Sequence, residues 1–352
     1  MLDFTSALFL GWRHPARGPD WPTLTTGRPA ALDEPPAAPA LAARIAARQG
    51  AEAGVVHRSA LHGLWDAVAT AVPSGGLVLV DEASYPLAVA ACAAALTRGA
   101  QVRPFRHHDV ADLVERADGR RGPIVAVTDG WCPGCNRPAP LPDLEAAVRA
   151  RGGVLLVDDT QAAGVLGHDP GRGAPFGTDG AGTVRWLGSR PGSAVQVSSL
   201  AKGYGAPLAV TTGPAAFVRP LRSRGTRWHA SPPTAADLAA ASAATADERR
   251  NDRLRERLAR LVARLRDGLA RLGLRAVGWP FPLVSVPVPA RTGRALLRRL
   301  AERDIRILLT VPRCRPSAVA VTWAVTARHR RAEIDRVLDV VSDAAWERTI
   351  PA

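Results

Sequence analysis

Short apolar segments alternate with helical patterns through the first half of the chain, and this alternation limits the fold more than any other feature of the sequence. The apolar segments cover residues 76–82, 102–105, 123–130 and 154–159, and the helical patterns cover residues 87–98, 109–117 and 141–151. Strands that are apolar along their whole length are typical of a parallel sheet buried on both faces. The sequence therefore predicts an α/β fold with a mostly parallel sheet covered by helices on both sides.

Three of these segments carry an aspartate at their carboxyl end, namely Asp81, Asp129 and Asp158. Ligands of open parallel sheets bind beyond the carboxyl ends of the strands. We therefore expect the functional site at this edge of the sheet.

The pattern changes after Trp228. A long amphipathic stretch over residues 236–272 forms one bent helix or two, and it is followed by predicted strands over 283–289, 305–312 and 318–325 and predicted helices over 292–304 and 330–346. This mixture predicts a smaller C-terminal α+β domain. With a Pro- and Gly-rich start, the chain divides into an N-terminal arm (1–35), a large domain (36–228) and a small C-terminal domain (229–352).

The formal net charge is +14, and arginine supplies almost all of the positive charge. Such a charge suits an anionic partner, whether nucleic acid, a nucleotide-containing substrate or a phosphorylated cofactor. It equally suits a base-composition bias, because the arginines are spread over helical patterns. No helix-turn-helix pattern or aromatic-studded basic stretch is present, so we expect no nucleic-acid partner.

No apolar run is long enough to span a membrane, so we expect no membrane partner. The first residues include Asp3 and carry no basic side chain ahead of their short apolar stretch, unlike a signal peptide. We therefore expect a cytoplasmic protein.

Lys202 is the only lysine in the chain. A buried lysine can form a Schiff base with an aldehyde, because burial lowers its pKa and frees its lone pair. An aspartate at a strand end, such as Asp158, can pair with a protonated pyridine nitrogen. Together the two residues indicate a site for pyridoxal 5'-phosphate (PLP).

The segments around these two residues resemble a known family. Asp158, Gly164 and Gly167 match one of its motifs, and Ser199 and Lys202 match a second motif that ends in a Gly-rich turn. The chain is thereby similar to PLP enzymes of fold type I, and most similar to their α-oxoamine synthase branch, which includes 8-amino-7-oxononanoate synthase. The resemblance runs from about residue 25 to about residue 340 and so covers most of the chain.

The resemblance implies roles for several residues. Lys202 would bind the cofactor and later remove a substrate proton, and Asp158 would pair with the pyridine nitrogen. Gln161 stands where the family has a histidine that contacts the ring hydroxyl, and Ser199 would hydrogen-bond the phosphate. Tyr85 would stack on the ring, although a core aromatic at a helix start is the alternative.

Residues 57–68 fall where the family binds the phosphate at a helix N-terminus. The backbone amides of Ser59, Ala60 and Leu61 would meet the phosphate there, because such a terminus favours an anion. His62 lies next to them in sequence, either as a contact or as a helix-surface residue.

The arginine that binds the substrate carboxylate in the family is replaced here by Thr322. Arg13 in the N-terminal arm is the first candidate to take over that role, followed by Arg313 and Arg315. A guanidinium is required because only it binds a carboxylate with two parallel hydrogen bonds.

Cys132 and Cys135 form a Cys-Pro-Gly-Cys segment. A metal site and a redox pair are both open interpretations, and only Cys92, Cys314 and scattered histidines could complete a metal site. A tight loop beside the cofactor is the favoured interpretation, so no metal is predicted. An even cysteine count in a large cytosolic chain indicates no disulfide framework.

The predicted function is that of a PLP-dependent transferase resembling an α-oxoamine synthase, which condenses an amino acid with an acyl-CoA. The alternatives are an aminotransferase, a PLP enzyme that forms carbon–carbon bonds in specialised metabolism, and a PLP-binding regulator without activity. We expect a homodimer with active sites at the subunit boundary and with the N-terminal arm lying on the neighbouring subunit.

Overall fold

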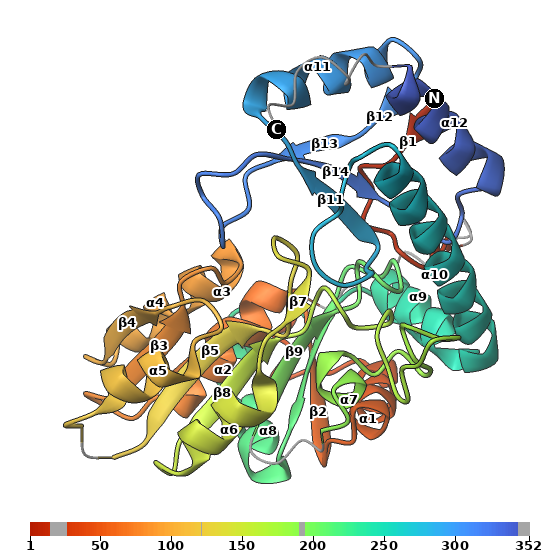
Figure 1. Ribbon diagram of the computed structural model, residues 1–352. Helices are drawn as coiled ribbons and strands as arrows, with labels where there is room; N and C mark the ends of the chain where they lie inside the picture. The colour runs from red at the N-terminus through yellow and green to blue at the C-terminus, as the bar shows by residue number, and fades with distance from the viewer. Residues whose placement is uncertain (15–26, 121, 190–193, 344–352) are drawn as a thin grey trace.

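A seven-stranded sheet forms the centre of the larger domain (Figure 1). The computed structural model describes residues 1–14, 27–120, 122–189 and 194–343. The strand order is β2 (Ala53–His57), β10 (Ala209–Gly213), β9 (Val195–Ser199), β8 (Val154–Asp158), β5 (Ile124–Asp129), β3 (Leu77–Asp81) and β4 (Gln101–Phe105). Only β10 runs antiparallel to its neighbours. The predicted mostly parallel α/β fold is confirmed.

Helices cover both faces of this sheet, which explains why its strands are apolar throughout. Val78 and Val80 of β3 pack in one apolar cluster with α2 (Ala60–Ala71), while Leu77 and Leu79 of the same strand pack in another. The second cluster includes residues of α5 (Val110–Ala117) and α6 (Leu141–Arg149). Successive side chains of a strand point to opposite faces, so each face needs its own apolar residues. The remaining helices of this domain are α1 (Ala37–Gln49), α3 (Pro86–Ala91), α4 (Ala93–Leu96), α7 (Thr183–Trp186) and α8 (Ala215–Leu221).

The smaller C-terminal domain lies above this sheet in Figure 1 and contains a three-stranded antiparallel sheet. Its strands are β11 (Leu283–Pro287), β14 (Ala320–Ala324) and β13 (Leu308–Thr310), in that order, and its outer helices are α11 (Ala290–Ala301) and α12 (Arg331–Ser342). The predicted α+β domain is confirmed, while the boundaries at residues 35 and 228 stay predictions. The end of the predicted helix 330–346 lies outside the described residues.

The long amphipathic stretch forms two helices, α9 (Ala235–Ala246) and α10 (Glu248–Arg271). Asp247 separates them, and its side chain caps α10 by accepting a hydrogen bond from the backbone N–H of Arg250 at 2.9 Å. An aspartate in this position satisfies a free amide of the first helical turn.

The described part of the N-terminal arm packs against its own chain, and the expectation that the arm also lies on a neighbouring subunit stays a prediction. β1 (Leu2–Asp3) pairs in parallel with β12 (Ile305–Arg306), and the ring of Phe4 stacks on His329 with centroids 4.1 Å apart. The backbone N–H of Phe9 donates to the carbonyl oxygen of Lys202 at 3.1 Å. The arm therefore links the small domain to the lysine loop; its residues 15–26 lie outside the described part.

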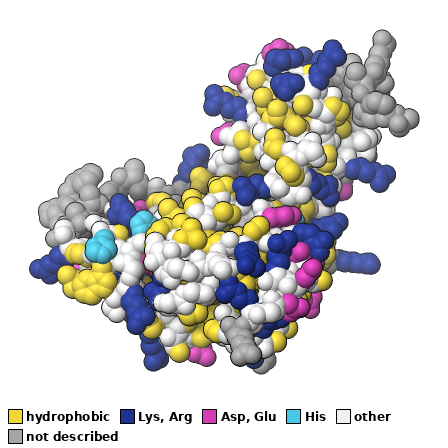
Figure 2. Space-filling view, turned by 90° about the vertical axis from the view of Figure 1, so that its left-hand side faces the viewer, with side chains coloured by type: hydrophobic (Ala, Val, Ile, Leu, Met, Phe, Trp, Pro, Cys, Tyr) yellow, Lys and Arg dark blue, Asp and Glu magenta, His cyan; other side chains and the backbone are white. Residues whose placement is uncertain are grey.

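Many arginines neutralise carboxylates within the fold. Arg48 pairs with Asp179 at 3.1 Å and with Glu248 at 2.6 Å, and the buried Arg255 pairs with Asp252 at 2.6 Å. On the face shown in Figure 2, basic side chains lie over both domains with acidic side chains among them. These arginines thus serve the structure by pairing with carboxylates of the same chain. Within the described residues, no helix is long and apolar enough to cross a membrane.

Candidate active site

Six strands of the large sheet, all except β10, end at one edge. Asp129 lies opposite Asp158 in the register of β5 and β8. Ser199 at the end of β9 and His57 at the end of β2 both pair with Ala209, where the antiparallel strand β10 begins. The segments that follow these ends carry most of the predicted site residues, as expected from their strand-end positions.

Asp158 is 6% exposed at the end of β8. Burial raises the pKa of its carboxyl above the usual value, while hydrogen bonding by Thr160 and the charge of Lys202 act in the opposite direction. The backbone N–H of Thr160 donates to its Oδ1 at 3.0 Å. A buried carboxylate of this kind is suited to a cationic partner, since an uncompensated charge in the interior is costly.

Lys202 follows β9 in a half-buried position beside the carboxylates. Burial lowers the pKa of its amine, and the charges of Asp158 and Asp129 partly oppose this effect. Its Nζ lies 5.5 Å from the ring centroid of Tyr85. A lowered pKa increases the fraction of neutral amine, which is the form that reacts with an aldehyde.

Hydrogen bonds hold the backbone of Tyr85 in place, and the ring of this residue is accessible. Its N–H donates to both carboxylate oxygens of Asp129, at 3.0 and 3.1 Å, just before α3 begins at Pro86. The residue is 44% exposed, so the alternative of a core aromatic is wrong. Asp129 thus positions Tyr85, and burial next to Asp158 raises the pKa of Asp129 well above its usual value.

The loop after β8 contributes Gln161 and Thr160. Gln161 Oε1 is buried and has no hydrogen-bond partner among the described residues. The Oγ1 of Thr160 accepts from the N–H of Ser199 at 3.2 Å, and so ties the two loops of the site together. Buried polar atoms nearly always have a partner, so the free oxygen of Gln161 fits a site that receives a polar ligand. Sequence analysis did not identify Thr160, because its role depends on the pairing of β8 with β9.

Ser59 caps the N-terminus of α2. Its Oγ lies 2.8 Å from Nδ1 of His62, and the amides of Ala60 and Leu61 belong to the first helical turn. Free amides and the helix dipole at such a terminus favour a phosphate. Ser199, at the end of β9, accepts a hydrogen bond at its Oγ from the N–H of Ala201 at 3.3 Å.

Comparison with known proteins agrees with this geometry. The family model described as aminotransferase class I and II matches residues 26–341. The 8-amino-7-oxononanoate synthase of Halorhodospira halophila is 31% identical over 313 residues, which cover 87% of this chain and 74% of the relative.

Two solved structures extend the comparison to the fold. Serine palmitoyltransferase of Sphingomonas wittichii superposes with a TM-score of 0.83 at 17% identity, covering 97% of this chain and 86% of that one. An 8-amino-7-oxononanoate synthase from Francisella tularensis gives a TM-score of 0.73 at 15% identity, covering 97% and 96%.

This chain belongs to the aminotransferase class I and II family. The resemblance to fold type I PLP enzymes and to their α-oxoamine synthase branch is confirmed. The protein is thus a PLP-dependent transferase, and the sheet edge with Lys202 and Asp158 provides residues that fit this cofactor.

The residue that we expect in place of the family's carboxylate-binding arginine is buried. Thr322 is 3% exposed in the middle strand of the small sheet, and its hydroxyl hydrogen-bonds Ser285 at 2.9 Å and Thr310 at 3.1 Å. A side chain held in this way cannot bind a carboxylate. An amino-acid substrate would therefore need another group to bind its carboxylate.

The three candidate arginines are all exposed. Arg313 extends from the loop between β13 and β14 to the large domain, where its Nη2 donates to the carbonyl oxygen of Glu82 at 3.3 Å. Arg315 lies two residues further along this loop. Arg13 follows Trp12 in the arm and precedes His14, whose Nε2 lies 3.2 Å from the carbonyl oxygen of Tyr204.

Proposed function

We propose that this protein is an α-oxoamine synthase-like transferase that condenses an α-amino acid with an acyl-CoA. The observation that carries the proposal is the arrangement of Lys202, Asp158 and Tyr85 at one sheet edge, with the lysine Nζ 5.5 Å from the tyrosine ring. The 8-amino-7-oxononanoate synthase relative and the fold of a serine palmitoyltransferase support acyl transfer as the reaction.

PLP, when bound, supplies a ring that accepts electrons from the α-carbon of the amino acid. Asp158 would keep a proton on the ring nitrogen, and Lys202 would hold the cofactor and then move the proton at the α-carbon. Tyr85 would cover one face of the ring and so fix its plane.

Two further groups of residues would fix the cofactor in place. The amides of Ser59, Ala60 and Leu61, together with Ser199, would hold the phosphate. Gln161 would contact the ring hydroxyl through its amide, which cannot titrate near neutral pH.

An assay of the purified protein with amino acids and acyl-CoA thioesters tests this function. We expect release of free CoA thiol that requires both substrates, with the condensed ketone identified by mass spectrometry. Tyr85 and Gln161 favour an aminotransferase as the second candidate. Amino-group transfer to a 2-oxo acid, without consumption of acyl-CoA, would establish that candidate instead.

Removal of the substrate-binding arginine is expected to weaken binding of the amino acid about a hundredfold, because a charge-assisted bidentate contact contributes about 2–3 kcal/mol. Arg313→Ala, Arg315→Ala and Arg13→Ala are the variants to compare by titrating the cofactor absorbance with amino acid. Arg291→Ala, an exposed arginine on α11, controls for the loss of one charge. If all three candidates match this control, the proposal of a relocated carboxylate-binding arginine is wrong.

A homodimer in the cytoplasm remains our proposal for the assembly and its location. Three large apolar side chains are exposed on α3 and α4, the helices that follow Tyr85 in the chain, namely Leu87 (38%), Val89 (38%) and Leu96 (59%). Exposed apolar side chains on neighbouring helices suit a subunit interface. The cysteines of the chain are all free, as is usual in a reducing compartment.

Light scattering is expected to give about twice the chain mass of 37.1 kDa. Leu96→Glu places a charge in the proposed interface and should shift the protein toward the monomer. A wild-type protein that is monomeric and fully active at assay concentrations would contradict the dimer.

A further inference from the structure

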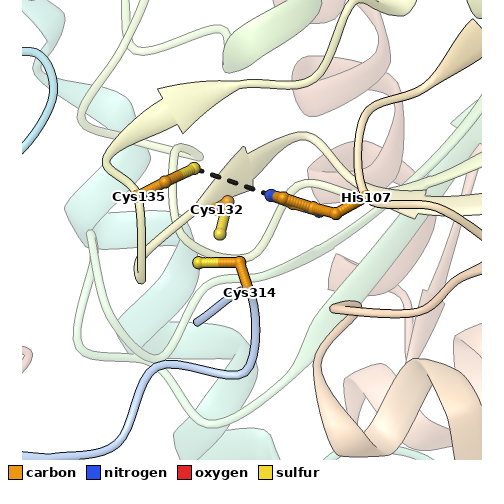
Figure 3. Close-up of side chains that lie close together, drawn as sticks. All are labelled: His107, Cys132, Cys135 and Cys314. Carbon is orange, nitrogen blue, oxygen red and sulfur yellow. Dashed lines mark hydrogen bonds between the residues drawn. The ribbon is translucent and has the colours of Figure 1, made fainter. Parts of the chain in front are cut away.

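Three cysteines and a histidine converge at the boundary between the two domains (Figure 3). Cys132 and Cys135 belong to a hairpin formed by β6 (Trp131–Cys132) and β7 (Arg137–Pro138), and His107 follows β4. Cys314 comes from the loop between β13 and β14 of the small domain. One ligand atom from each of the four side chains lies within 4.8 Å of all the others.

One distance in the cluster equals the ligand spacing of a tetrahedral zinc site. Zinc bonds of about 2.3 Å to sulfur and about 2.0–2.1 Å to nitrogen place a sulfur and a nitrogen ligand about 3.6 Å apart. The distance between Cys135 Sγ and His107 Nε2 is 3.6 Å. Three thiolates and an imidazole are a common ligand set of structural zinc sites.

The buried carboxylate of Asp81 orients the imidazole of His107 through its Nδ1 atom. Nδ1 of His107 lies 2.8 Å from Oδ1 of Asp81, which is 1% exposed, so Nδ1 donates and Nε2 faces the cysteines. The carboxylate also accepts from the backbone N–H groups of Ala83 at 2.9 Å and His108 at 3.0 Å. A carboxylate that orients a histidine in this way is the usual outer partner of a zinc ligand.

A glycine in the hairpin allows Cys314 to approach the hairpin backbone closely. A Cβ atom on Gly134 would lie 2.7 Å from Cys314 Sγ and 2.9 Å from Pro312 Cβ, so only glycine fits between the two cysteines of the hairpin. Asn136, with a φ of 50°, follows in the left-handed region and donates from its side chain to the carbonyl oxygen of Leu283 at 2.8 Å.

The other interpretations of the cysteine pair use fewer of these residues. A redox disulfide between Cys132 and Cys135 gives no role to Cys314 or to the orientation of His107. A tight loop beside the cofactor likewise requires neither Cys314 nor an oriented His107. Only a metal uses all four side chains.

We propose that His107, Cys132, Cys135 and Cys314 together bind one structural zinc ion. Four protein ligands close the coordination sphere, so the ion takes no part in the reaction. The ion ties the loop that carries Cys314 and Arg313 to the large domain. This proposal replaces the sequence-based expectation of no metal and holds whatever reaction the enzyme catalyses.

Metal analysis of the purified, untagged protein tests the proposal. We expect about one zinc per chain in the wild type, and a decrease of about tenfold or more in Cys314→Ser and His107→Ala. Cys92→Ser is the matched control, because Cys92 is buried in a helical segment, where its Sγ donates to the carbonyl oxygen of Ala88. Its zinc content should equal that of the wild type. Asp81→Asn should weaken zinc affinity about 10- to 100-fold in competition with a chelator.

Cobalt substitution of the wild type gives a second readout that does not depend on the folding of any variant. Co²⁺ bound by three thiolates in a tetrahedral site produces long-wavelength d–d bands and thiolate charge-transfer absorption. Absence of these bands would overturn the proposal. A Cys132–Cys135 disulfide found by peptide mapping of the fresh protein, iron in place of zinc, or undiminished zinc in Cys314→Ser would each overturn it as well.

Discussion

Lys202→Ala is expected to lower turnover by at least about 10³-fold, since a positioned proton-transfer group alone contributes about 10²–10⁴-fold. The variant should also lose the covalent link to PLP while retaining weak binding through the phosphate. Lys202→Arg should behave in the same way, because a guanidinium stays protonated and cannot form the link.

Borohydride reduction followed by peptide mapping gives an unusually clear measurement here. Because the chain contains no second lysine, a label fixed by reduction must lie on Lys202 or on the N-terminal amine. We expect it on the peptide that contains Lys202. A labelled N-terminus with an unlabelled Lys202 peptide would refute the assignment.

Asp158→Asn is expected to preserve the fold and reduce turnover about 10²–10³-fold, the loss typical of one preorganised electrostatic contact in a site that excludes water. The amide cannot keep the ring nitrogen of PLP protonated, so the ring accepts electrons less well. Steady-state kinetics on protein loaded with PLP measure the effect.

Asp159→Asn is the matched control for this variant. Asp159 is also buried, and burial raises its pKa to about 7, but its carboxylate accepts a hydrogen bond from the N–H of Thr183 at 3.0 Å, within the body of the fold. We expect turnover close to that of the wild type. Equal losses in the two variants would mean that Asp158, too, is structural.

The sequence predicted four of the seven strands of the large sheet closely, because apolar strands between helices leave a local signal. The segment 76–82 became the strand 77–81, and 123–130 became 124–129. The strands β2, β9 and β10 were not identified, and the antiparallel direction of β10 is decided by distant partners. The N-terminal pairing of β1 with β12 was missed for the same reason.

In the candidate site, too, local sequence signals identified some residues, while contacts between distant residues identified others only in the folded chain. Lys202 and Asp158 were recognisable because one residue is unique and the other ends a strand. Asp129 was noted only as a strand end, and its hydrogen bonds to the Tyr85 backbone depend on how β3 and β5 pair. The sequence left a metal site at Cys132 and Cys135 as an open but disfavoured interpretation, because Cys314 and His107 are remote in sequence from this hairpin and meet it only in the folded chain.

The N-terminal arm has a consequence for the order of events during synthesis. The backbone of Asp3 contacts the ring of His329, 326 positions later in the chain. The ribosome makes the arm well before the strand and the histidine that receive it. Contacts so distant in sequence form late. Phe9 of the same arm also donates a backbone hydrogen bond to the carbonyl oxygen of Lys202. The loop around Lys202 therefore lacks this contact until the small domain, which binds the arm, has been made.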